Sequence, residues 1–163
     1  MATVLDANEM FYTTFQPKVK NSYVLLVDNI PSFLINAVDP PKFQDQSIKI
    51  DHINSYFKIR GKREWQDVQI TLYDPITPSG AQACMDWARL GYESVTGRAG
   101  YQDWYKKDVT LQILGPVGDV VSEWVYVGAW IRDFTPDKLE WSNNGDTANI
   151  SCTLVYDYAV LSY

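Results

Sequence analysis

The stretch that decides the fold is residues 66–73, QDVQITLY, in which polar and apolar side chains alternate. The apolar positions are Val68, Ile70 and Leu72, and the polar positions are Asp67, Gln69 and Thr71. Successive side chains of a strand point to opposite faces of its sheet. This period of two therefore predicts a strand with one buried face and one wet face.

A second stretch, residues 147–158, repeats this alternation near the end of the sequence. Its apolar positions are Ile150, Cys152, Leu154 and Tyr156, and its polar positions are Asn149, Ser151, Thr153 and Asp157. Neither polar set contains Lys or Arg, although the solvent face of a sheet often carries them. Short neutral and acidic side chains indicate a confined wet surface along which something passes without binding.

Residues 46–60 are predicted to form a long β-hairpin with arms at 46–51 and 54–59. Both arms alternate between apolar and polar side chains, which is typical of a hairpin with one wet face. The apolar positions are Ile48, Ile50, Phe57 and Ile59. Further strands are expected at residues 22–28, 108–114 and 120–132, and residues 33–38 form another apolar run.

The strand expected over residues 120–132 is apolar on both faces. Trp124, Tyr126 and Trp130 are expected to share one face, where aromatic rings could line a sugar-binding platform. Val125, Val127 and Ala129 are expected on the other face. A strand without a polar face is more typical of one buried on both sides, as in an oligomer.

One helix is expected, over residues 78–91, with Thr77 as its N-cap and Pro78 at its first position. An apolar stripe at helical spacing consists of Ala81, Cys84, Met85 and Ala88. The sequence therefore predicts one domain, residues 1–163, of mainly antiparallel β-structure with one flanking helix. Residues 1–20 are expected to form an N-terminal arm, with a short helix at residues 6–15.

Composition excludes several classes of function. The chain has 163 residues, a net charge of −6 and a sequence pI of about 4.6, which argues against a protein that clamps phosphates or docks on an anionic membrane. The negative charge lies in residues 108–163, which hold eight acidic and two basic side chains. No apolar run approaches the roughly 20 residues of a membrane span, and no signal peptide is expected. We therefore expect synthesis in a reducing cytosol.

No residues form a convincing catalytic, metal or cofactor site, and we expect that the protein is not an enzyme. The sole histidine, His52, falls at the expected hairpin tip. Cys84 and Cys152 lie on apolar faces, so both are expected to be buried thiols. The sharpest cluster of charge is basic and consists of Lys58, Arg60, Lys62 and Arg63.

Several motifs, taken in order, resemble the tail tube proteins of contractile-tailed bacteriophages. The final third matches best, through residues 128–144, GAWIRDFTPDKLEWSNN, followed by Ile150 and residues 153–158, TLVYDY. A second match is residues 57–71, FKIRGKREWQDVQIT, where a basic Gly-x-Arg segment leads into a strand. Asp86-Trp87 and Tyr105-Lys106-Lys107 also fit, and the likeness spans roughly residues 20–158.

This resemblance implies a β-sandwich or split barrel with a flanking helix, assembled into hexameric rings that stack into a tube. Strands of neighbouring subunits would join in one inner β-barrel around a channel. The polar positions of the two alternating strands would then face the channel, with Asp157 included. The basic cluster would contact a neighbouring subunit or ring, with a solvated charged arm as the alternative. The hairpin would reach an adjacent ring.

The resemblance also implies partners and a location. DNA and a tape-measure protein would pass inside the tube, a sheath would surround it, and a tube initiator on the baseplate and a tail terminator would bind its ends. The assembly would be part of the virion, built in the cytoplasm of a bacterial host. Two alternatives remain open, namely the inner tube of an injection or secretion system that delivers proteins, and a monomeric carbohydrate-binding domain.

Overall fold

The computed structural model describes residues 16–162, so the helix expected at residues 6–15 lies outside the described part. The strands are β1 (Tyr23–Leu26), β2 (Ile35–Val38), β3 (Lys42–His52), β4 (Ser55–Gln66), β5 (Val68–Tyr73), β6 (Lys107–Leu114), β7 (Val120–Pro136), β8 (Asn149–Val155) and β9 (Tyr158–Leu161). The helices are the 3₁₀ turn η1 (Ser32–Leu34), α2 (Gly80–Gly91) and α3 (Gln102–Tyr105). The expected mainly antiparallel β-fold is confirmed.

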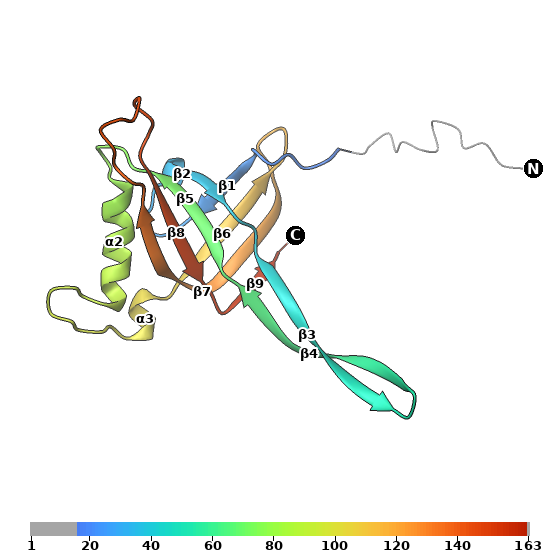
Figure 1. Ribbon diagram of the computed structural model, residues 1–163. Helices are drawn as coiled ribbons and strands as arrows, with labels where there is room; N and C mark the ends of the chain where they lie inside the picture. Colours follow the sequence, from blue (N-terminus) through green and yellow to red (C-terminus); the bar gives the residue numbers. More distant parts are fainter. Residues whose placement is uncertain (1–15, 163) are drawn as a thin grey trace, which may run out of the picture.

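Seven strands form one antiparallel sheet in the order β1-β6-β7-β8-β5-β2, with β9 added to β7 (Figure 1). Strand β7 belongs to both halves of this sheet, because its first part pairs with β6 and β9 whereas residues 130–136 pair with β8. The core contains side chains from both halves, including Leu25 and Val109 from one and Ile70 and Ile150 from the other. The sheet therefore folds over its own apolar face as a split barrel.

The two stretches with clear alternation lie side by side as β5 and β8. Ile70 is opposite Cys152, and Gln69 is opposite Thr153. All six apolar side chains of the pair are at most 4% exposed: Val68, Ile70, Leu72, Ile150, Cys152 and Leu154. A slip of one residue would turn all of them toward solvent, so burial determines the register.

The strand expected over residues 147–158 is divided in two. Pairing with β5 starts at Asn149, and β8 ends at Val155. The chain turns at Asp157, and β9 then pairs with the first half of β7. The local alternation continues through the turn, which explains why the sequence suggests a single strand.

The expectation that Trp124, Tyr126 and Trp130 share a face is wrong for Trp130. Val109 of β6 is opposite Tyr126 of β7, and Lys107 is opposite Ala129. Two steps along β6 therefore match three steps along β7, so β7 contains one extra residue. Gly128 occupies this bulge with a positive φ of 67°, a conformation that glycine adopts without strain. The extra residue reverses the alternation, so Ala129 is buried in place of Trp130.

Helix α2 covers the core beside the sheet and begins two residues later than expected. Its N-cap is Ser79, whose Oγ accepts a hydrogen bond from the Gln82 amide, and not Thr77. Cys84 and Trp87 are buried, and Trp87 Nε1 donates to the Tyr105 carbonyl at 2.7 Å. Among the described residues, no helix is long and apolar enough to cross a membrane.

Candidate functional site: a polar wall and a projecting hairpin

The outer face of the half-sheet formed by β5, β8 and the end of β7 is polar and continuous. We call this face the polar wall; it consists of Gln69, Thr71, Ser151, Thr153, Asp133 and Thr135. Thr153 is opposite Gln69 on one side and Asp133 on the other, and Ser151 lies between Thr71 and Thr135 in the same way. Neighbouring strands are about 4.8 Å apart, so these short side chains form one uninterrupted surface.

Four of the seven residues expected to line a channel therefore come together, namely Gln69, Thr71, Ser151 and Thr153. Asp133 and Thr135 were not expected there. Polar and apolar side chains do alternate near the end of residues 131–135. The register shift between Ile131 and Asp133, however, means that the face on which each side chain lies can be assigned only once the partner strand is known.

Asp67 and Asn149 lie at opposite ends of the polar wall. Asp67 occupies the break between β4 and β5, where it pairs with Arg132 of β7. The guanidinium of Arg132 also binds Asp133 at 3.0 Å, and the hydrogen bond to Asp133 raises the pKa of Arg132. A cation that the sequence did not associate with this face therefore bridges its two carboxylates.

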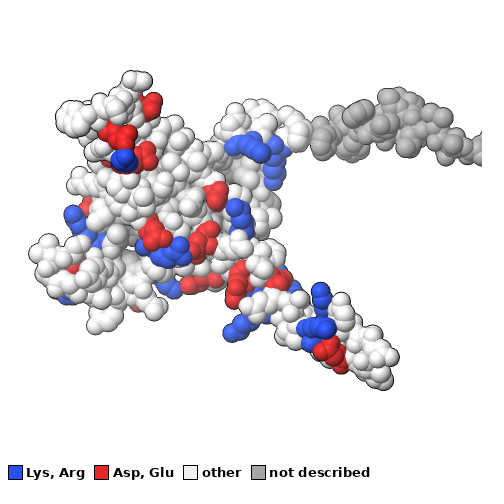
Figure 2. All heavy atoms as spheres, viewed as in Figure 1, with Lys and Arg blue, Asp and Glu red and all other residues white. Residues whose placement is uncertain are grey.

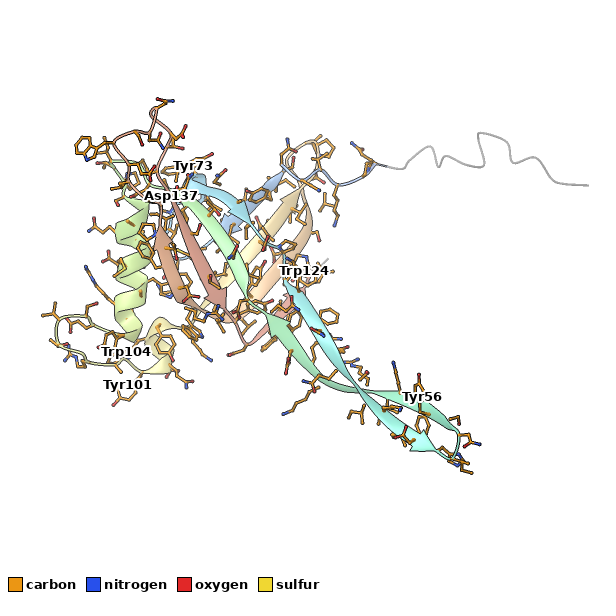
Figure 3. All side chains as sticks on the ribbon, in the orientation of Figure 1. Tyr56, Tyr73, Tyr101, Trp104, Trp124 and Asp137 are labelled. Atoms are coloured by element: carbon orange, nitrogen blue, oxygen red, sulfur yellow. The ribbon has the colours of Figure 1, made fainter. Side chains whose placement is uncertain are left out.

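At the other end, Asn149 is opposite Tyr73. Tyr73 is labelled in Figure 3. Its amide donates to Asp137 Oδ2 at 2.9 Å, while its side-chain Oδ1 is buried without a hydrogen-bond partner among residues 16–162. Asn149 thus marks the boundary of the polar wall.

Asp157 does not lie on the polar wall. It occupies the turn between β8 and β9, where its amide donates to the Val127 carbonyl. Both carboxylate oxygens bind Lys106 Nζ at 2.9 Å, beside the bulge at Gly128. The alternation of residues 147–158 assigned Asp157 to the strand face because a turn leaves no mark in a period-two pattern.

The hairpin β3–β4 spans residues 42–66, which is longer than the expected 46–60, and projects from the body as a separate two-stranded sheet (Figure 1). Its outer part pairs Ile48 with Ile59 and Ile50 with Phe57, so the expected apolar face is present. These four side chains are between 38% and 54% exposed. Figure 3 shows Tyr56 in this outer part, away from the core.

The base of the hairpin turns its aromatic side chains to the opposite face. A register shift between Asp45 and Ser47 reverses the alternation, and Phe43 then pairs with Trp65. Trp65 packs near the ring of Tyr156, with ring centroids 5.9 Å apart. The base is therefore anchored to the body, whereas the outer apolar face has no partner within the described chain.

The basic cluster divides into two pairs of residues. Arg63 binds both oxygens of Asp45, at 2.7 and 2.9 Å, and lies over the ring of Phe43, while Arg60 binds the same carboxylate at 3.0 Å. The hydrogen bond from Arg63 lowers the pKa of Asp45. Lys58 and Lys62 form no ion pair with any described residue, and they remain available for a neighbouring molecule.

The remaining candidates lie apart from the polar wall. His52 is exposed at the hairpin tip, as expected. Cys84 and Cys152 are buried with their Sγ atoms 3.6 Å apart, and this contact together with burial raises the pKa of the Cys152 thiol. Within residues 16–162 no three His, Cys, Asp or Glu side chains are grouped closely enough to hold a metal ion.

No family model and no curated protein matches the sequence. Solved structures do resemble it. A chain of the anti-feeding prophage cap, a tube-terminating cap, gives a TM-score of 0.75 at 15% identity over 96% of this chain and 99% of that chain. This chain has the tube-protein fold of contractile injection systems.

Two further structures come from an extracellular contractile injection system, both at 18% identity. A chain of its sheath/tube terminator gives a TM-score of 0.74 over 92% of this chain and 99% of that chain. A chain of its sheath-tube complex gives a TM-score of 0.71 over 90% of this chain and 91% of that chain. The resemblance drawn from the sequence motifs is therefore confirmed at the level of the fold.

Proposed function

We propose that this chain is a structural tube protein of a contractile tail, and that its hexameric rings stack into a conduit. The observation that carries the proposal is the polar wall. It lies on a half-sheet whose outer strands, β2 and the end of β7, each pair with only one described strand. Pairing β2 of one subunit with β7 of the next would close a barrel and remove both exposed edges.

The chemistry of the polar wall suits transport. Its side chains are short and mostly neutral, and Arg132, a cation beside it, is already bound to Asp67 and Asp133. Repeated around a ring, the described residues of this surface would offer passing phosphates no free cation and would leave a slight excess of negative charge. Cargo would then slide along the channel and would not bind to it.

The hairpin supports assembly independently. A two-stranded hairpin is at best marginally stable in water, and this one exposes four large apolar side chains on its outer face. Apolar surface of this kind indicates a protein–protein contact. A neighbouring subunit or ring would cover it.

Within this role, the DNA conduit of a phage tail is our first candidate. The tape-measure protein and the genome would occupy the channel, a sheath would surround the tube, a baseplate initiator and a tail terminator would bind its ends, and the protein would be found in virions. A tube that delivers proteins is the second candidate, because the structures compared above belong to the anti-feeding prophage and an extracellular contractile injection system. The uniform polar wall suits either cargo.

Electron microscopy of the purified protein over a wide range of concentrations tests the assembly. Rings or hollow tubes with six-fold symmetry are expected, either from the protein alone or after addition of its baseplate. A protein that stays monomeric under all these conditions contradicts the proposal, and glycan binding by that monomer would support the carbohydrate-binding alternative.

A further inference from the structure

A second unpartnered surface lies at the end of the molecule opposite the hairpin tip (Figure 1). We call it the end surface and define it as residues 74–79 and 137–148. Its two segments touch, because the Asp74 amide donates to the Ala148 carbonyl at 3.2 Å. An open groove runs along the second segment between Asp137 and Asn149.

The end surface exposes large apolar side chains. Ile76 is 99% exposed, Leu139 86% and Trp141 fully exposed. A tryptophan without any packing is unusual in a soluble domain, because burial of its ring removes a large apolar area from water. Three such side chains at one end of the molecule indicate a contact with another protein.

The end surface is also acidic. It holds four carboxylates, Asp74, Asp137, Glu140 and Asp146, against the single cation Lys138. Figure 2 shows acidic side chains gathered at this end of the molecule. Lys138 is bound to Glu140, and Asp74 and Asp137 accept local hydrogen bonds. Asp146 makes no ion pair with any residue in the described range.

The hairpin is complementary to the end surface in both respects. Residues 42–66 carry six basic and three acidic side chains, the reverse of the excess at the end surface. Lys58 and Lys62 are unpaired there, and the outer apolar face is uncovered. Strand β3 has eleven residues and is therefore about 37 Å long, so the hairpin extends well beyond the body of its own subunit.

Complementary surfaces at opposite ends of one molecule generate open, head-to-tail assembly. We propose that the hairpin of one copy seats on the end surface of a copy in the next ring. The outer apolar face would cover Leu139 and Trp141, and Lys58 and Lys62 would approach Asp146 and Glu140. This proposal rests on the proposed tube function and names the pair of surfaces that stack its rings.

Wild-type tubes give the most direct test. A zero-length carbodiimide cross-linker joins amines to carboxylates that are in contact. We expect mass spectrometry to find Lys58 or Lys62 linked to Asp146 or Glu140, and such links must be intermolecular because the two surfaces lie at opposite ends of one subunit. Tubes that cross-link efficiently elsewhere but never between these surfaces overturn the proposal.

Charge reversal with rescue provides the second test. We expect either double charge reversal to raise the concentration needed for tube growth roughly tenfold: Lys58→Glu with Lys62→Glu, or Glu140→Lys with Asp146→Lys. Each contact loses only a little binding free energy, but the loss is repeated around each ring. Combining the four changes should restore growth. Asp103→Lys on α3 is the control for added charge, and circular dichroism verifies folding.

The outcomes separate this inference from the function on which it rests. Absence of rings and tubes in the wild type would refute the tube function itself. Normal tubes from the end-surface variants, with or without loss of sheath binding, would leave the tube function intact and refute the stacking contact. Single rings that no longer stack, together with rescue in the fourfold variant, would support it.

Discussion

The Gly128→Ala substitution should destabilise the fold more than a glycine substitution usually does. Gly128 has a positive φ of 67°, and an added Cβ would lie 2.5 Å from Asp157 Oδ2 and 3.1 Å from Asp157 Cγ. Asp157 would therefore have to move away from Lys106, which it binds through both oxygens. The change thus strains the bulge and breaks an ion pair together.

The two effects can be estimated separately. A left-handed backbone costs a residue with a side chain about 1–2 kcal/mol. Loss of the Lys106–Asp157 pair adds about 1 kcal/mol, near the upper limit for an exposed pair, because the side chain of Asp157 is 52% exposed. We therefore expect the free energy of unfolding to fall by about 2–3 kcal/mol.

Gly118→Ala is the matched control, since Gly118 also has a positive φ, 84°, but its added Cβ would meet no atom within 4 Å. Urea denaturation should show a loss of only about 1–2 kcal/mol for this variant. Asp157→Ala combined with Gly128→Ala should lose less than the sum of the two single changes. Equal losses of unfolding free energy in Gly128→Ala and Gly118→Ala would refute the clash with Asp157. Strictly additive losses from Gly128→Ala and Asp157→Ala would refute it too.

Three further predictions concern the hairpin, the core and the polar wall. Because Arg63 lowers the pKa of Asp45, their pair stabilises the hairpin above about pH 3.9 and is lost as the pH falls through the lower folded value. NMR titration should place the Asp45 midpoint nearer its ordinary value in Arg63→Gln than in the wild type. Cys84 and Cys152 should resist a thiol reagent in the native protein and both react after unfolding, whereas rapid native labelling would contradict their burial. Thr153→Lys should permit tube assembly but slow DNA passage, most strongly at low salt, and ejection at the normal rate would contradict the sliding surface.

The sequence alone determined what depends on neighbours within one segment. Burial of one strand face imposes a period of two, so strands could be predicted over residues 66–73 and 147–158, and the buried sides of β5 and β8 could be identified. The same pattern identified the hairpin and the apolar side of its outer part. Helical spacing located α2 to within two residues at its start.

Tertiary structure decided everything that depends on which strands pair. The bulge at Gly128 and the register shift before Asp133 reverse the alternation of β7, and only the partner strands reveal where this happens. The same is true of the ion pairs that Arg60 and Arg63 form with Asp45. Residues far apart in sequence meet in these cases, and a local pattern contains no information about distant partners. The polar wall exists as one surface only because pairing brings three separated segments together.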